Sequence, residues 1–206
     1  MNIEKKQIVF IHGGNAYSEY KNFLEWLRVK EIEDPLEEGV FKKWQPTLRT
    51  SLSQSYDVYY PAMPNSKNAK YEEWKIWFER HHAFLRDGVT LIGHSLGGYF
   101  LAKYLSEEKM PVSVHALYFL AAPFENDDFG GEDGGDFAFD SQNLHRLALQ
   151  VDGVYIFHSK DDSVVPYTHA LKYAEALPGA ELVSFEDKNH FLHEKFPEII
   201  EHIQKH

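Results

Sequence analysis

The chain of 206 residues contains no cysteine. This absence excludes a disulfide framework, a thiolate nucleophile and cysteine-ligated zinc. Basic residues are also scarce: 21 lysines and arginines stand against 32 aspartates and glutamates, which gives a formal net charge of −11. Because phosphate backbones and anionic lipid surfaces bind basic faces, this balance argues against nucleic acid or a membrane as a partner.

Long apolar runs are missing as well. No stretch approaches the roughly 20 apolar residues of a membrane-spanning helix. The apolar run 8–11 is too short for the core of a signal peptide, so we expect a cytoplasmic protein. The twelve histidines show no H-E-x-x-H spacing, and the acidic residues show no EF-hand spacing. We therefore expect no metal site and no cofactor.

The residues that are present predict one domain over 1–206. Hydrophobic residues make up 43 % of the chain, which is enough for a core that can stand alone. Short apolar runs alternate with segments of helical periodicity, which predicts an α/β fold: a three-layer α/β/α sandwich with about six mostly parallel strands and helices on both faces. The expected strands are 8–11, 56–60, 89–92, one within 112–121, 154–157 and 182–185.

Two segments interrupt this alternation. Residues 29–55 combine an acidic stretch, a break at Pro35, and Trp44 and Leu48 on expected short helices, and we interpret them as an excursion on the surface. Residues 125–140 are rich in glycine and acid, and they follow the fourth strand at the carboxyl edge of the sheet, where open α/β folds bind ligands. We expect this second segment to be a mobile loop that borders the pocket. The apolar wall that it offers would consist of Phe124, Phe129 and Phe137.

The most specific motif is Gly93-His94-Ser95-Leu96-Gly97, which fits G-x-S-x-G between a strand and a helical segment. In that context the pattern marks a nucleophilic serine on a tight turn. The two glycines allow the strand and the helix to pass closely, and Ser95 would lie at a helix N-terminus, which favours negative charge. A structural serine cap and a phosphate loop are the alternatives, and the latter lacks its lysine because His94 occupies that position.

A serine nucleophile needs a base, and the base needs an orienting acid. After such a motif, the acid and the histidine come from loops that follow two later strands. The first of these loops carries Asp161 and Asp162, and the second carries His190, with His193 as its nearest rival. The D-x-x-V-P arrangement favours Asp162, and Asp161 is interpreted as a turn residue that binds its own backbone.

Two backbone N–H groups are expected to stabilise an oxyanion. One belongs to Leu96, the residue after the nucleophile, and the other comes from the loop after the first strand. In that loop we choose Gly14, with Asn15 next, and we also expect Asn15 to line the substrate pocket. His12, in the same loop, is interpreted as structural.

Together these motifs resemble the α/β-hydrolase superfamily. They are similar to the compact serine hydrolases of the retinoblastoma-binding protein nine family. The motifs that carry the resemblance are IHGG at 11–14, GHSLGG at 93–98, HSKDDSVVP at 158–166 and NHF at 189–191. The resemblance implies Ser95 as nucleophile, Asp162 as acid and His190 as base, in a reduced sheet with little or no lid.

We therefore predict a serine hydrolase that cleaves small carboxylic esters through an acyl-enzyme intermediate, as a monomer or a homodimer. Thioesterase, amidase or lactonase activity stays open, because the three residues do not name the leaving group. A prediction from a different class is an inactive hydrolase fold that binds a protein partner.

Overall fold

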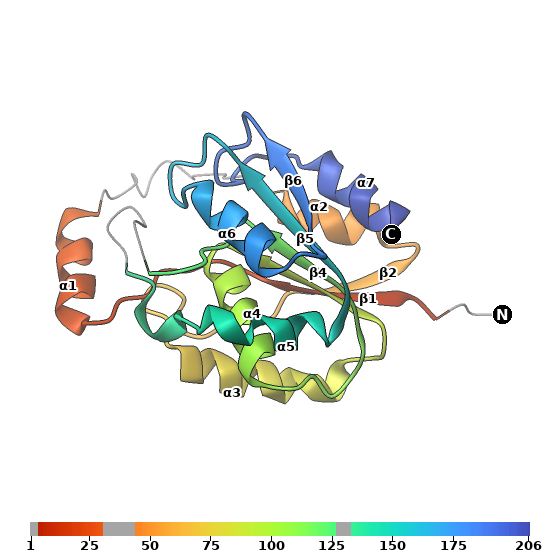
Figure 1. Ribbon diagram of the computed structural model, residues 1–206, viewed down its shortest axis with the longest axis horizontal. Coiled ribbons are helices and arrows are strands. Elements are labelled where there is room, and N and C mark those ends of the chain that lie inside the picture. Colours follow the sequence, from red (N-terminus) through yellow and green to blue (C-terminus); the bar gives the residue numbers. More distant parts are fainter. Residues whose placement is uncertain (1–3, 31–43, 127–132) are drawn as a thin grey trace.

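A computed structural model describes residues 4–30, 44–126 and 133–206. These residues form a six-stranded sheet of order β2-β1-β3-β4-β5-β6, in which every neighbouring pair of strands is parallel (Figure 1). The six predicted strands are confirmed. Their bounds are β1 (Lys6–Ile11), β2 (Tyr56–Tyr59), β3 (Val89–His94), β4 (Val114–Leu120), β5 (Val151–Ser159) and β6 (Glu181–Phe185).

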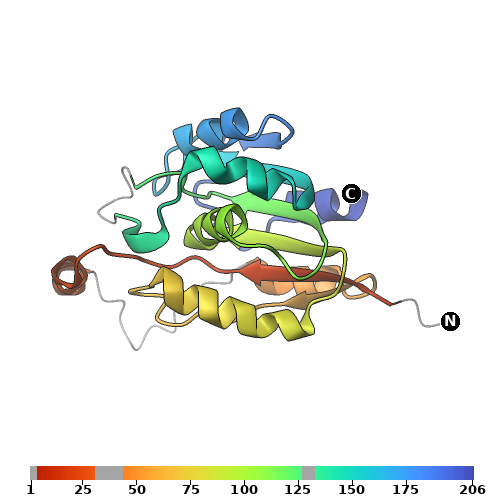
Figure 2. The ribbon, with the colours of Figure 1, turned by 60° about the horizontal axis from the view of Figure 1, so that its bottom comes forward.

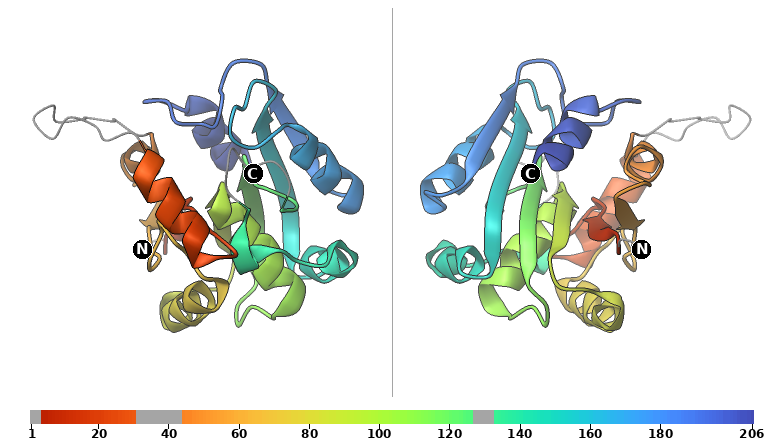
Figure 3. Two further views of the ribbon diagram at one scale, coloured as in Figure 1. Left: turned by 90° about the vertical axis from the view of Figure 1, so that its left-hand side faces the viewer. Right: turned by 90° about the vertical axis from the view of Figure 1, so that its right-hand side faces the viewer.

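Helices cover both faces of the sheet, which confirms the predicted three-layer sandwich. Figure 3 shows α2 and α7 on one side of the sheet and α3 to α6 on the other. The bounds of the helices are α1 (Tyr20–Val29), α2 (Gln45–Ser51), α3 (Tyr71–His81), α4 (Leu96–Glu107), α5 (Leu144–Ala148), α6 (Thr168–Ala176) and α7 (Pro197–Lys205).

The inner strands are apolar along their whole length because both of their faces are buried. In β1, Ile8 and Phe10 join the core beneath α2 and α7, whereas Val9 and Ile11 join the core beneath α3 to α6. Successive side chains of a strand point to opposite faces, so a strand covered on both sides needs an unbroken apolar run. The run that the sequence offers at 8–11 is therefore explained.

The interpretation of residues 29–55 as a surface excursion is wrong for 44–52, whereas Val29 is 82 % exposed. Trp44 and Leu48 have no exposed surface, and Leu52 is 2 % exposed. These residues recur every four positions, so that one face of α2 packs against the sheet beside α7. Residues 31–43 lie outside the described residues.

Helix α1 follows the first strand, but it does not pack its apolar face against the sheet. No residue of α1 is buried, and Tyr20 and Leu27 are 64 % and 50 % exposed. Figure 2 shows α1 at the end of the molecule opposite the N-terminus. None of the helices in the described ranges combines the length and the apolar character that crossing a bilayer requires.

The described part of the acidic, glycine-rich segment is attached to the body of the protein. Phe137 has no exposed surface and packs edge-on against Trp74, with ring centroids 5.2 Å apart. Lys103 donates hydrogen bonds to the carbonyl groups of Asp136 and Ala138. Phe137 is thus a core residue and not a pocket wall, and the mobility predicted for 125–140 stays a prediction.

The parallel sheet brings four loops to one edge. The carboxyl ends of β1, β3, β5 and β6 all point in the same direction, so the loops that follow them converge there (Figure 1). These loops carry Gly14, Ser95, Asp162 and His190.

Candidate active site

Ser95 lies on a strained turn between β3 and α4. Its backbone angles are φ 54° and ψ −124°, a region that residues with a side chain rarely occupy. Such a conformation costs on the order of 1–3 kcal/mol and persists only where its surroundings hold it. The Ser95 N–H donates to the carbonyl of Leu120 at 2.8 Å, and its own carbonyl accepts the first hydrogen bonds of α4.

The glycines of the motif permit this turn because no side chain would fit at their positions. A Cβ at Gly97 would lie 2.2 Å from the carbonyl oxygen of Ile11, and one at Gly93 would lie 2.5 Å from the Cα of Gly98. Real Cβ atoms do not approach other atoms so closely. The helix start can therefore lie directly against strands β1 and β3 only with glycine at these positions.

Asp162 and His190 form a hydrogen-bonded pair. The Nδ1 atom of His190 lies 2.9 Å from Oδ2 and 3.1 Å from Oδ1 of Asp162. The Asp162 side chain has no exposed surface, and that of His190 is 6 % exposed. Because a carboxylate can only accept, Nδ1 carries the hydrogen, and the Nε2 atom of a neutral His190 keeps its lone pair.

Asp162 is held in its charged form by a shell of donors. Burial alone would raise the pKa of this carboxyl group, but its interactions with His190 and His158 outweigh that effect and hold the pKa well below its ordinary value. The Nε2–H of His158 is donated to the carbonyl of Val165 at 2.8 Å and lies 3.4 Å from Oδ2 of Asp162. The N–H groups of Val164 and Val165 also donate to Oδ1, at 2.8 and 2.9 Å.

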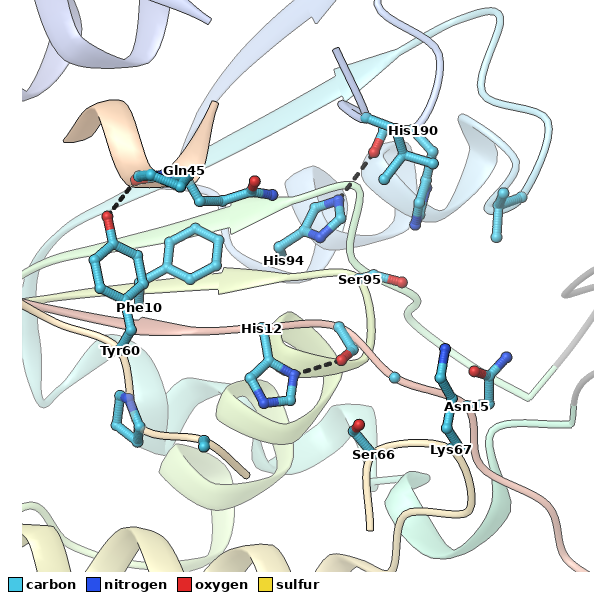
Figure 4. Close-up of a pocket in the computed structure, with 17 residues that line it drawn as sticks. Phe10, His12, Asn15, Gln45, Tyr60, Ser66, Lys67, His94, Ser95 and His190 are labelled. Carbon is cyan, nitrogen blue, oxygen red and sulfur yellow. Dashed lines mark hydrogen bonds between the residues drawn. The ribbon is translucent and has the colours of Figure 1, made fainter. Parts of the chain in front are cut away.

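Ser95 and His190 line one cavity of about 690 Å³ at the carboxyl edge of the sheet (Figure 4). The Ser95 hydroxyl makes no hydrogen bond to any described residue, so the second hydrogen bond of the chain, from Ser95 to His190, is not formed. In free enzymes such bonds are often long and tighten only when substrate binds.

The two loops that carry Asp162 and His190 are bound to each other. The carboxylate of Asp161 accepts hydrogen bonds from the Ser159 hydroxyl at 2.5 Å and from the Asn189 N–H at 2.8 Å. The side chain of Asn189 in turn accepts from the hydroxyl of Ser163 at 3.0 Å. The Asp161 carboxylate thus interacts with its own backbone, as expected, and in addition it links the two loops.

Two N–H groups near Ser95 have no acceptor among the described residues. They belong to Leu96 and Gly14, the two donors expected from the sequence. The N–H of Asn15 is instead donated to the carbonyl of Ser66 at 2.8 Å. Because this hydrogen bond occupies Asn15, Gly14 is the better of the two donors in the loop after β1.

Three residues make contacts in the site that the sequence did not predict. His158, which is 1 % exposed, lies 3.4 Å from Asp162 through its Nε2 atom. His94 donates from Nε2 to the carbonyl of His190 at 2.9 Å, and the indole of Trp44 donates to the carbonyl of Phe191 at 2.8 Å. The spacing of Trp44, Leu48 and Leu52 could have indicated a buried helix, whereas no sequence pattern marks the other two contacts.

The three residues predicted to line the pocket differ in where they lie. Asn15 lines the cavity. Phe124 does not, because its ring packs against Phe139 and Tyr173 in the core, with centroids 5.5 and 4.9 Å away. Phe129 lies outside the described residues.

His12 has the structural role expected of it. Its Nε2 atom accepts a hydrogen bond from the N–H of Met63 at 3.0 Å, so Nδ1 carries the hydrogen and donates to the carbonyl of Gly13 at 2.6 Å. This neutral imidazole joins the loop after β1 to the loop after β2.

One group of potential metal ligands exists among the described residues, and it lies away from Ser95. It consists of Glu181, His202 and His206, whose ligand atoms lie within 4.8 Å of one another. The two imidazole rings are stacked, with centroids 4.5 Å apart.

Comparisons with known proteins agree with this geometry. A family model described as serine hydrolase matches residues 37–205. Among solved structures, the chain is similar to the ydeN gene product from B. subtilis, with a TM-score of 0.74 and 18 % identity over 98 % of each chain. No curated protein matches the sequence significantly.

Two further solved structures share the fold. One is a meta-cleavage product hydrolase from Pseudomonas fluorescens, with a TM-score of 0.67 and 14 % identity over 98 % of this chain and 90 % of that one. The other is an esterase from Exiguobacterium antarcticum, with a TM-score of 0.59 and 16 % identity over 98 % and 91 %. The predicted α/β-hydrolase superfamily is thereby confirmed. The narrower resemblance to the retinoblastoma-binding protein nine family stays a prediction.

Proposed function

Because the chain belongs to the serine hydrolase family, we propose that it cleaves carboxylic esters of small molecules through Ser95, His190 and Asp162. The observation that carries this proposal is the convergence of a strained serine and a histidine on one cavity, with a buried carboxylate behind the histidine. A core built only for stability would not require these three features together.

In the first half of the reaction, Ser95 Oγ attacks the ester carbonyl carbon while Nε2 of His190 takes the hydroxyl proton. The negative charge that develops on the carbonyl oxygen is stabilised by the N–H groups of Leu96 and Gly14. The tetrahedral intermediate then collapses, the bond to the alcohol oxygen breaks, and the proton on His190 passes to that oxygen. The products of this half are the free alcohol and Ser95 acylated on Oγ.

In the second half, water replaces the alcohol. His190 removes a proton from the water as its oxygen attacks the acyl carbon, and the same two N–H groups stabilise the second oxyanion. When the bond to Ser95 Oγ breaks, that oxygen recovers the proton from His190. Asp162 stays ionised throughout and holds Nδ1–H, so that Nε2 always faces the reacting atoms.

The test is covalent labelling with a fluorophosphonate together with hydrolysis of p-nitrophenyl esters. We expect the probe to label Ser95 and Ser95→Ala to lose turnover by a factor on the order of a million, down to the detection limit. Ser53→Ala is a matched control at an exposed serine beyond the end of α2, and its labelling and turnover should equal those of the wild type. Folded wild-type protein that neither reacts with the probe nor hydrolyses any ester would contradict the proposal and favour a binding role.

A further inference from the structure

The cavity beside Ser95 has an unusual charge for this protein. The chain carries a net charge of −11, yet the lining of the cavity, drawn from the described residues, includes no aspartate or glutamate. Lys67 is the one lysine or arginine in that lining. A lining with one cation and no carboxylate attracts an anion at short range.

The main chain of Lys67 is held close to the oxyanion donors. The carbonyl of its neighbour Ser66 accepts the N–H of Asn15 at 2.8 Å, and the carbonyl of Asn15 accepts the N–H of Ala69 at 2.9 Å. A Cβ on Gly14 would lie only 2.6 Å from the Ser66 oxygen, which shows how closely the two loops approach. The position of Lys67 relative to Gly14 is therefore determined by the fold.

The amino group of Lys67 makes no ion pair or hydrogen bond with any described residue, whereas nearby Lys70 donates to the carbonyl of Tyr17 at 2.7 Å. Figure 4 shows the side chains of Lys67 and Asn15 directed toward the part of the cavity where Ser95 lies. Phe10 and Tyr60 lie on the opposite side of Ser95 in the same view. The cavity thus has a cationic end at Lys67 and an aromatic end at Phe10 and Tyr60, where the amide of Gln45 also lies, with the nucleophile between them.

We infer that the substrate is an ester that carries a carboxylate on one side of the scissile bond and an apolar group on the other, with Lys67 as the residue that binds the carboxylate. This inference rests on the proposed function, because it names the substrate class of the same site. The aromatic rings of Phe10 and Tyr60 receive the apolar half.

The experiment compares matched esters in the intact protein. For a carboxylate on the acyl half, mono-p-nitrophenyl adipate is paired with p-nitrophenyl 6-methylheptanoate, in which an isopropyl group replaces the carboxylate. For a carboxylate on the alcohol half, 4-carboxyphenyl butyrate is paired with 4-isopropylphenyl butyrate. The quantity measured is the ratio of kcat/KM for the charged ester to kcat/KM for its neutral partner.

In Lys67→Met we expect this ratio to fall about fivefold for one of the two pairs, mainly through KM, as for a half-exposed ion pair. Lys67→Glu should lower it further, and about 1 M salt should remove most of the difference because the Debye length is then about 3 Å. Lys109→Met, at an exposed lysine between α4 and β4 on the opposite edge of the sheet, should leave the ratio unchanged.

The outcomes separate this inference from the function on which it rests. If the wild type hydrolyses the esters and neither ratio changes in Lys67→Met, the assignment of Lys67 is overturned while the esterase stands. An equal change in Lys109→Met would also overturn it, because the effect would then belong to the net charge. If the wild type hydrolyses none of the esters, the proposed function itself fails and the assignment falls with it.

Discussion

Asp162 receives more hydrogen bonds than any other residue of the site described above. Its two oxygens face His190, His158 and the N–H groups of Val164 and Val165. The D-x-x-V-P pattern favoured this aspartate in the sequence, and the structure gives the physical reason: the turn after Asp162 returns two N–H groups to its own carboxylate. His158 was not foreseen, because a contact between a buried strand end and the next loop has no periodicity.

The two adjacent aspartates should differ strongly in their effect on turnover. We expect Asp162→Asn to lower kcat on the order of 10⁴-fold, because an amide in place of the carboxylate no longer selects the Nδ1–H tautomer of His190. Asp161→Asn should cost no more than about tenfold, since it weakens only the link between the two loops. Steady-state kinetics of the two variants gives the comparison.

A pH profile adds a second check on Asp162. The pKa of this carboxyl group lies well below its ordinary value, so protonation of Asp162 should not set the acid limit of activity in the wild type.

If Asp161→Asn proved the more damaging of the two substitutions, the assignment of the acid would be wrong.

At the scale of elements, the strands were predictable and the covering helices only in part. A short apolar run in the sequence indicates a strand that is buried on both faces, as it does for β1 and β3. By contrast, α2 has one buried apolar residue, Leu48, with Trp44 and Leu52 just outside its two ends, and it has Pro46 near its start. Its burial depends on the neighbouring strand β2 and on residues of β1 and α7, which lie far away in the sequence.

This misjudged element reaches the site through Trp44. Its indole donates to the carbonyl of Phe191, the residue after His190, and its ring packs edge-on against Phe196 with centroids 5.2 Å apart. Asn189 and Phe191, on either side of His190, both have positive φ angles, of 42° and 52°. A loop strained in this way needs external support, which Trp44 supplies from the opposite side of the core.

Trp44→Phe should therefore lower kcat, with a smaller effect on KM. The substitution keeps an aromatic ring but leaves the carbonyl of Phe191 without its donor. We expect a loss of about 1–3 kcal/mol in the free energy of unfolding, measured by urea titration. Trp77→Phe is the matched control, since this indole is 39 % exposed on α3. Equal effects of the two substitutions on kcat would refute the supporting role of Trp44.

At the scale of the whole molecule, the two cores contain an uncommon number of buried phenol groups. Burial raises the pKa of Tyr60 to about 12. Burial likewise raises the pKa of Tyr71, Tyr104, Tyr118 and Tyr173 well above the ordinary value of 10. All of these groups are protonated in the folded chain near neutral pH, so their ionisation does not change the free energy of unfolding there.

Above about pH 10 the balance changes, because an unfolded chain releases the phenol protons and the folded chain retains them. The free energy of unfolding is therefore unaffected by these phenols below their pKa in the unfolded chain, and it falls as the pH rises toward their pKa in the folded chain. Each buried phenol lowers the free energy of unfolding by up to about 1.4 kcal/mol per pH unit in that window. Since native proteins are stable by only about 5–15 kcal/mol, we expect cooperative unfolding between about pH 10 and pH 12.

Tyrosinate absorbance, followed together with circular dichroism, tests this prediction. In guanidinium chloride all twelve tyrosines should ionise near pH 10, whereas in the native protein the buried ones should ionise only as the helical signal is lost. Tyr104→Phe should move the alkaline midpoint upward, because it removes a phenol that ionises on unfolding and loses only a 3.5 Å contact with Glu79. Tyr20→Phe, at a ring that is 64 % exposed, should leave the midpoint unchanged. Reversible ionisation of all twelve phenols near pH 10 with an unchanged helical signal would show that the tyrosines are not buried as described.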